Sequence, residues 1–103
     1  YTFYSLINLK ILILSYNKIR KIDALGFFNL NKLTKLELSS NQLNFINNQA
    51  YLFLTSLGNF DLSYNNFEII KNDSWKNLLM LRNLNLANNR IKEIEIFGFR
   101  NLN

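Results

Sequence analysis

The chain has 103 residues, of which 49% are hydrophobic, and its 12 basic and 7 acidic residues give a formal net charge of +5 at pH 7. This length suits one domain, and the scattered charge bears on solubility and association rather than on the fold. The sequence contains no Cys, His or Pro, which excludes a disulfide framework and histidine-based catalysis. No apolar stretch reaches about 18 residues, so no membrane-spanning helix is predicted.

One six-residue motif occurs four times along the chain, at intervals of 24 residues. The copies are LSYNKI at 14–19, LSSNQL at 38–43, LSYNNF at 62–67 and LANNRI at 86–91. The 19 Asn residues could also indicate low-complexity disorder, but the regular apolar spacing argues against it. We therefore predict a single repetitive domain with a partial repeat at 1–8 and repeats at 9–32, 33–56, 57–80 and 81–103.

Each repeat contains two apolar residues that stand two positions apart and therefore point to the same face of a short strand. In chain order these pairs are Leu12 and Leu14, Leu36 and Leu38, Phe60 and Leu62, and Leu84 and Leu86. Stacked repeats would form a parallel sheet from these strands. The second half of each repeat is too short for a long helix, so we expect turns and short 3₁₀ or extended pieces there.

An Asn occupies the same place in every repeat, three residues after the second strand leucine. The four are Asn17, Asn41, Asn65 and Asn89. An amide supplies both donors and an acceptor, and an unpartnered buried polar group costs about 1–3 kcal/mol. We therefore interpret this column as a structural ladder that satisfies the turns after the strands, rather than as a catalytic or ligand site.

Each period reads Leu-x-x-Leu-x-Leu-x-x-Asn-x-apolar, which resembles the leucine-rich repeat family, specifically its 24-residue "typical" class. The resemblance implies an α/β solenoid: a right-handed horseshoe segment with a parallel β-sheet on the concave face. The family often has Pro just after the conserved Ile, where this chain has Asp23, Asn47, Lys71 and Glu95. Because neither end shows a polar cap, we expect an uncapped segment of a larger solenoid.

The strand residues that point away from the core vary in chemistry, whereas the core positions keep their type. This contrast, and the family resemblance, predict a binding surface on the concave face. The predicted ligand-binding residues are Ile11, Ile13, Tyr16, Lys35, Glu37, Asn59, Asp61, Tyr64, Asn83 and Asn85. Within it, Ile11, Ile13 and Tyr16 would form an apolar anchor beside the acidic pair Glu37 and Asp61. Alternatively, the two isoleucines are ordinary exposed residues, or are covered by preceding repeats or glycans.

The sequence offers no catalytic constellation, cofactor motif or metal site. Glu37 and Asp61 are two carboxylates without a supporting His, Cys or third acid. Lys18, Arg20 and Lys21 could attract nucleic acid or sulfated glycans, but a solvated edge is the simpler interpretation. Asn72 opens an Asn-Asp-Ser glycosylation acceptor, a pattern that is also expected by chance in so Asn-rich a chain.

These features favour a protein-binding module rather than an enzyme. The resemblance implies a place in the ectodomain of a cell-surface or secreted recognition receptor, in innate immunity, adhesion or development. Its localisation would be extracellular, and this segment would not insert into a membrane. Two alternatives stay open: structural spacer repeats, and a cytoplasmic scaffold or regulatory arm of an enzyme.

Overall fold

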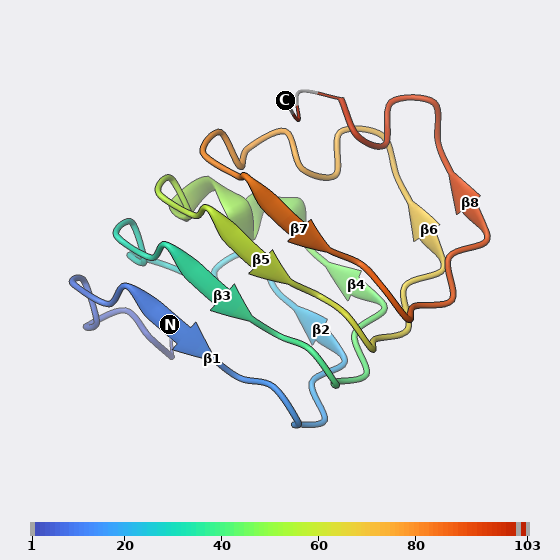
Figure 1. Ribbon diagram of the computed structural model, residues 1–103. Coiled ribbons are helices and arrows are strands. Elements are labelled where there is room, and N and C mark those ends of the chain that lie inside the picture. The colour runs from blue at the N-terminus through green and yellow to red at the C-terminus, as the bar shows by residue number, and fades with distance from the viewer. Residues whose placement is uncertain (1, 101, 103) are drawn as a thin grey trace.

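The computed structural model describes residues 2–100 and residue 102, so the predicted outer limits at Tyr1 and Asn103 lie outside the described residues. The chain coils four times and places a short strand on each side of every coil (Figure 1). The elements are β1 Ile11–Ile13, β2 Lys21–Ile22, β3 Lys35–Glu37, β4 Phe45–Ile46, the 3₁₀ helix η1 Asn48–Phe53, β5 Asn59–Asp61, β6 Ile69–Ile70, β7 Asn83–Asn85 and β8 Glu93–Ile94.

The strands β1, β3, β5 and β7 form one continuous parallel sheet in that order. Their register advances by one repeat at each step, so Leu12 pairs with Leu36, Leu36 with Phe60 and Phe60 with Leu84. Each of these residues is the middle residue of its strand and turns toward the inside of the coil, as the alternation of side chains requires. The predicted parallel-sheet solenoid is therefore confirmed.

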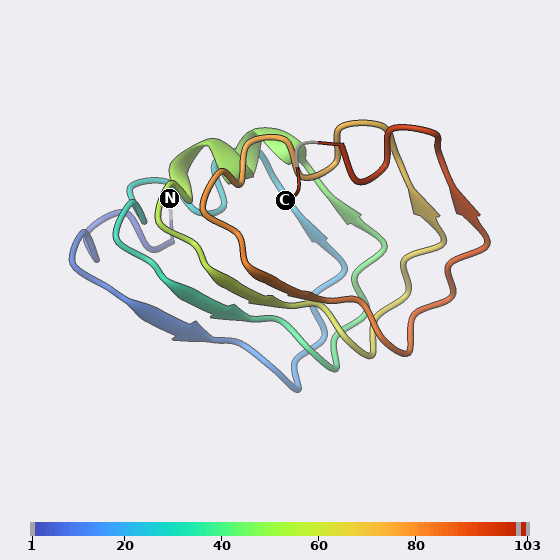
Figure 2. The same ribbon diagram turned by 45° about the horizontal axis from the view of Figure 1, so that its top comes forward.

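The opposite, convex side of the coil is built from shorter pieces. There β2 pairs with β4 and β6 pairs with β8, both in parallel, which makes two separate two-stranded sheets. Turns and the 3₁₀ helix η1 complete this side. Figure 2 shows the four-stranded sheet and the convex strands on opposite sides of the coil. The predicted turns, 3₁₀ and extended pieces are thus present, with β4 and η1 adjacent in one repeat.

The hydrophobic core runs along the inside of the coil and is best closed in the two middle repeats. Leu36 and Leu62 are fully buried, and the rings of Tyr51, Phe60 and Trp75 pack edge-on or stacked with centroids 5.8–6.5 Å apart. In the last repeat, by contrast, Ile94 and Phe99 are 55% and 42% exposed. The same sequence columns therefore give different burial according to whether a repeat is covered on both sides.

The part of the chain that the structure describes contains no helix of the length and apolarity needed to cross a bilayer.

Candidate functional site

The concave face is the outward side of the sheet β1-β3-β5-β7, and the structure places on it the strand residues that the sequence assigned to binding. Alternation along each strand turns the first and last residues outward while the middle one faces the core. Ile11 and Ile13 on β1 are 54% and 59% exposed. They form an apolar strip at one edge of the sheet, where β1 has a sheet neighbour on one side only among the described strands.

The acidic pair lies in the middle of this face, because register pairs Glu37 on β3 directly with Asp61 on β5. Each carboxylate already has a partner. Lys35 Nζ lies 2.8 Å from Glu37 Oε1, and Asp61 Oδ1 accepts hydrogen bonds from the Ser63 backbone N–H at 2.9 Å and from its hydroxyl at 2.7 Å. The pair is thus held in place by its own strands, and no cluster of three acidic groups that could hold a metal ion occurs in the described ranges.

Side-chain amides dominate the other half of the face. Asn83 Nδ2 donates to Asn59 Oδ1 across β5 and β7 at 2.6 Å, and Asn85 Oδ1 accepts from the Ala87 backbone N–H at 3.0 Å. These residues, with the acidic pair and Lys35, line a shallow hollow of about 730 Å³. Its floor is the sheet itself, so any occupant would meet a rigid polar surface rather than a deep pocket.

Arg82 also lines this hollow, although it is not among the predicted ligand-binding residues. It precedes β7, and among the described residues it forms no ion pair. The signal was available in the repeat spacing, because Arg82 lies 24 residues after Gly58 and immediately before Asn83. A guanidinium beside two carboxylates and three amides gives the hollow both donor and acceptor character.

Tyr16 and Tyr64 project from the turns that follow β1 and β5, and they are 85% and 60% exposed. Both have a left-handed backbone conformation, with φ of 60° and 56°. Ser40 and Asn88 hold the equivalent turns with φ of 55° and 57°. A bulky residue is disfavoured in this region by roughly 1–3 kcal/mol. The turn geometry belongs to every repeat, and the tyrosines occupy it without burying their rings.

The Asn column forms a continuous ladder behind the strand ends. Asn65, only 4% exposed, donates to the carbonyls of Leu38 and Leu62 at 2.9 and 3.1 Å and accepts from the Leu43 N–H at 2.9 Å. Asn41 and Asn89 repeat this arrangement one repeat earlier and one later. Within the described part of the chain, the exposed Asn17 donates only to carbonyls of its own turn, those of Leu14 and Ser15. The amides therefore act on the backbone, not on a ligand surface.

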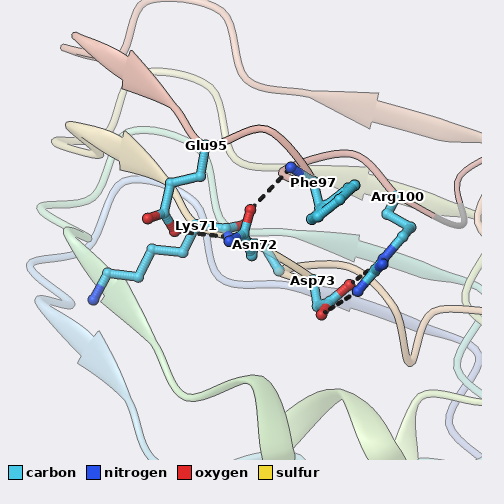
Figure 3. A network of polar contacts seen from close by, with 7 residues as sticks. Lys71, Asn72, Asp73, Glu95, Phe97 and Arg100 are labelled. Atoms are coloured by element: carbon cyan, nitrogen blue, oxygen red, sulfur yellow. Dashed lines mark hydrogen bonds and ion pairs between the residues drawn. The ribbon is translucent and has the colours of Figure 1, made fainter.

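The glycosylation candidate Asn72 lies on the convex side, within a network of polar contacts (Figure 3). Its side-chain Oδ1 accepts from the Phe97 N–H at 2.9 Å, and its backbone N–H donates to Glu95 Oε1 at 2.8 Å. Asp73 is held beside it by a two-bond contact with Arg100, at 2.9 and 3.0 Å. The Nδ2 atom of Asn72, which would carry a glycan, makes no hydrogen bond to the described residues, and the residue is exposed.

Comparison with known proteins defines the class to which this architecture belongs. The family model described as leucine rich repeat matches residues 1–43 and 32–91, and the chain therefore belongs to the leucine-rich repeat family. Modules of this family typically bind proteins and are generally not enzymes. The solenoid with its parallel sheet is thus the leucine-rich repeat fold.

A solved structure described as the crystal structure of a TLR13–ssRNA13 complex is similar to this chain, with 22% sequence identity and a TM-score of 0.47. The match covers 97% of this chain and 21% of that one, so the chain spans about a fifth of that protein's length. No curated protein matches the chain.

Proposed function

We propose that this chain is a protein-recognition module that binds its partner on the concave face. The observation that supports this most directly is the contrast between the two sides of the sheet. Inward positions of β1, β3, β5 and β7 are uniformly Leu or Phe, whereas outward positions carry acidic, basic, amide and apolar groups. A rigid scaffold with a chemically mixed face loses little conformational entropy when it binds.

In the proposed mechanism, the rigid concave face binds its partner through non-covalent contacts and catalyses no reaction. The apolar strip of Ile11 and Ile13 and the exposed rings of Tyr16 and Tyr64 would supply buried contact area, since aromatic residues dominate binding energy at interfaces. The polar hollow beside them would set orientation through Asp61, Arg82 and the Asn59–Asn83 amide pair. Because their strands and turns are fixed by the sheet and the ladder, these groups are already in position before a partner arrives.

A binding screen followed by a matched pair of triple variants tests this proposal. The chain is used as bait against a panel of purified receptor ectodomains and secreted proteins, and affinity for any partner found is measured by interferometry. Combined substitution of Ile13, Asp61 and Tyr64 by Ala should weaken binding about 100-fold, as the loss of central contacts predicts. The control combines Ala at Lys21 on β2, Leu52 on η1 and Glu93 on β8, which are exposed on elements of the convex side, and should change affinity less than about twofold.

Equal affinity of the two triple variants would contradict binding on the concave face and would favour the spacer alternative, in which these repeats only hold a distant site in place. Circular dichroism of each variant should show an intact fold, because none of the six side chains belongs to the buried core.

We further propose that the chain belongs to the ectodomain of a cell-surface or secreted receptor. The 24-residue class of repeat and the exposed acceptor Asn72 support this. The test is to express the full-length protein in its native cells, label surface proteins with a membrane-impermeant biotin reagent, and treat them with peptide N-glycosidase. Surface labelling together with a mobility shift that Asn72→Gln removes is the expected result. A protein that stays unlabelled would favour the intracellular scaffold alternative.

A further inference from the structure

The glycosylation acceptor that Asn72 opens is bonded to the following repeat through its first two residues (Figure 3). Asn72 accepts from the Phe97 backbone N–H through its Oδ1 at 2.9 Å and donates its own backbone N–H to Glu95 Oε1 at 2.8 Å. Asp73 donates its backbone N–H to the Phe97 carbonyl at 3.1 Å, and its carboxylate accepts two hydrogen bonds from Arg100. We refer to Glu95, Phe97 and Arg100 as the repeat-four clamp.

The third residue of the acceptor is engaged as well. The Ser74 hydroxyl donates to the Lys71 carbonyl at 2.6 Å, and the intervening Asp73 has a left-handed backbone with φ of 57°. This kind of acceptor is defined by an Asn and a hydroxyl two positions later, so the transferring enzyme must contact both groups at once. In the folded chain, the amide oxygen and the hydroxyl are both occupied, and the backbone between them is sharply turned.

The product of glycosylation, by contrast, fits the fold. A glycan is carried on Nδ2 of the acceptor amide, and in Asn72 this atom makes no hydrogen bond to the described residues. The residue is also exposed. A glycan at this position would therefore leave both contacts of Asn72 with the clamp intact.

We propose that Asn72 accepts its glycan only while the repeat-four clamp is open, so that stacking of the fourth repeat ends the modification. In the reaction, Nδ2 bonds to C1 of the sugar of a lipid-linked oligosaccharide diphosphate. The bond from C1 to the diphosphate oxygen breaks, the diphosphate leaves with the bonding electrons, and Nδ2 gives one proton to a base of the transferase. The inference rests on the proposed extracellular function, because a chain in the secretory pathway meets this donor.

Chain order sets the time available for the reaction. Arg100 lies 27 positions after Asp73, so the acceptor is synthesised before the clamp. At a synthesis rate of about 5–20 residues per second, this separation corresponds to about 1–5 s. Once formed, the clamp reopens by local unfolding, which keeps the reactive population small. We therefore expect partial glycosylation of Asn72 in the wild-type protein.

An acceptor assay in vitro tests the proposal without depending on where the protein resides. Solubilised microsomal membranes supply the transferase and its lipid-linked donor, and glycosylation is scored as a mobility shift that peptide N-glycosidase removes. Within the 103 residues, Asn72 is the single Asn with Ser or Thr two positions later, so the shift reports one site. A synthetic peptide of residues 69–77, which lacks the clamp, should be modified at least about tenfold faster than the folded chain.

Two double variants of the whole chain assign this difference to the clamp. Glu95→Ala with Arg100→Ala removes the side-chain contacts with the acceptor and should raise the rate about tenfold. Glu93→Ala with Arg90→Ala removes the same two charges from exposed positions of the same repeat and should leave the rate unchanged. Urea unfolding of both variants separates opening of the clamp from loss of the whole fold.

Three results would overturn the proposal. They are equal rates for the folded chain and the peptide, equal rates for the two double variants, and no modification of the peptide. Each of these leaves the extracellular proposal to its own test, which is surface labelling in cells. A protein that is unlabelled in cells would contradict the extracellular proposal and would leave the rates of the acceptor assay unchanged.

Discussion

The two sides of this solenoid are closed by the same 24-residue repeat, yet one side is continuous and the other is interrupted. On the concave side, every strand meets the next in register, and the Asn ladder satisfies the turns behind it. On the convex side, β4 and β6 do not pair, and one buried indole N–H has no partner among the described residues. The concave columns hold residues of nearly constant shape, whereas rings of several sizes stand at Phe27, Tyr51, Trp75 and Phe99. An identical repeat length therefore does not by itself give continuous strand pairing on both sides.

The largest effect is expected from breaking the ladder on its buried rung. Asn65→Ala removes the acceptor of the Leu43 N–H and leaves that group unpartnered in the core. We expect a loss of about 2–4 kcal/mol in the free energy of unfolding, measured in urea. Asn17→Ala is the control, because Asn17 is exposed and contacts only its own turn, and it should cost less than about 1 kcal/mol. Similar losses for the two variants would show that the ladder does not stabilise the stack.

High pH should destabilise the protein through ionisation of the buried tyrosine Tyr51. Burial raises the pKa of the Tyr51 phenol, because the phenolate would lose its hydration in the core. Because the pKa is raised in the folded state, the contribution of protonated Tyr51 to the free energy of unfolding is fully present below pH ~10. It declines as the pH rises further, by about 1.4 kcal/mol per pH unit. Urea unfolding between neutral and alkaline pH should show this decline, and Tyr51→Phe should reduce it. An identical alkaline decline in the variant would contradict the assignment to Tyr51.

The turns at the concave edge offer a test of backbone strain. Because Tyr64 has a φ of 56°, the β-branched Tyr64→Val should be less stable than Tyr64→Asn by about 1–2 kcal/mol. Asn is the matched control, since Asn88 already occupies the equivalent turn. Thermal unfolding of the pair measures the difference directly, and equal melting temperatures would mean that the turn relaxes to another conformation.

A smaller effect is expected where the convex side is interrupted. Trp75→Phe deletes part of a buried ring but also removes an unpartnered donor, and the two changes offset each other. We expect the free energy of unfolding to change by less than about 1 kcal/mol. The loss of stability is to be compared with that of Asn65→Ala, because the side chains of Trp75 and Asn65 are about equally buried. A loss as large as that of Asn65→Ala would contradict the expected offset between the lost ring area and the removed donor.

The smallest effect concerns the exposed contact between Asp73 and Arg100. Hydrogen bonding by Arg100 holds the pKa of Asp73 below its ordinary value. The stabilisation that this contact provides is therefore present above pH ~4 and is lost as the pH falls through the folded-state pKa. Arg100→Gln should return the pKa of Asp73 toward its ordinary value in a carboxyl NMR titration, whereas Arg20→Gln should not. An unchanged titration in Arg100→Gln would contradict the contact.

The repeat spacing predicted the concave half of the fold well. The pairs Leu36/Leu38 and Phe60/Leu62 predicted the strands, and the constant 24-residue step predicted their register, because parallel stacking aligns equivalent positions. The same spacing brought Glu37 and Asp61 together. It did not reveal that each already has a partner, since the Lys35 and Ser63 contacts depend on side-chain conformation.

The convex features could not be predicted from the spacing. The repeat spacing at β4 and β6 is the same as at the paired convex strands, so it specifies neither the interruption between them nor the unpartnered Trp75 N–H within the described residues. The left-handed turns at Tyr16 and Tyr64 were missed for a related reason, because tyrosine has no preference for that conformation and the repeat imposes it.

Each buried rung of the Asn ladder reaches back to the repeat before it: Asn41 donates to Leu14, and Asn65 donates to Leu38, both 27 positions earlier. A duplicated repeat would contain its own ladder Asn, and the repeat before it would supply the backbone carbonyl that accepts from this Asn. An insertion of any other length between two strands must instead bulge out as a loop, or it would shift the next amide away from its carbonyl. Duplication of a whole repeat therefore preserves the hydrogen bonds of the ladder, and such a protein lengthens most easily by whole coils.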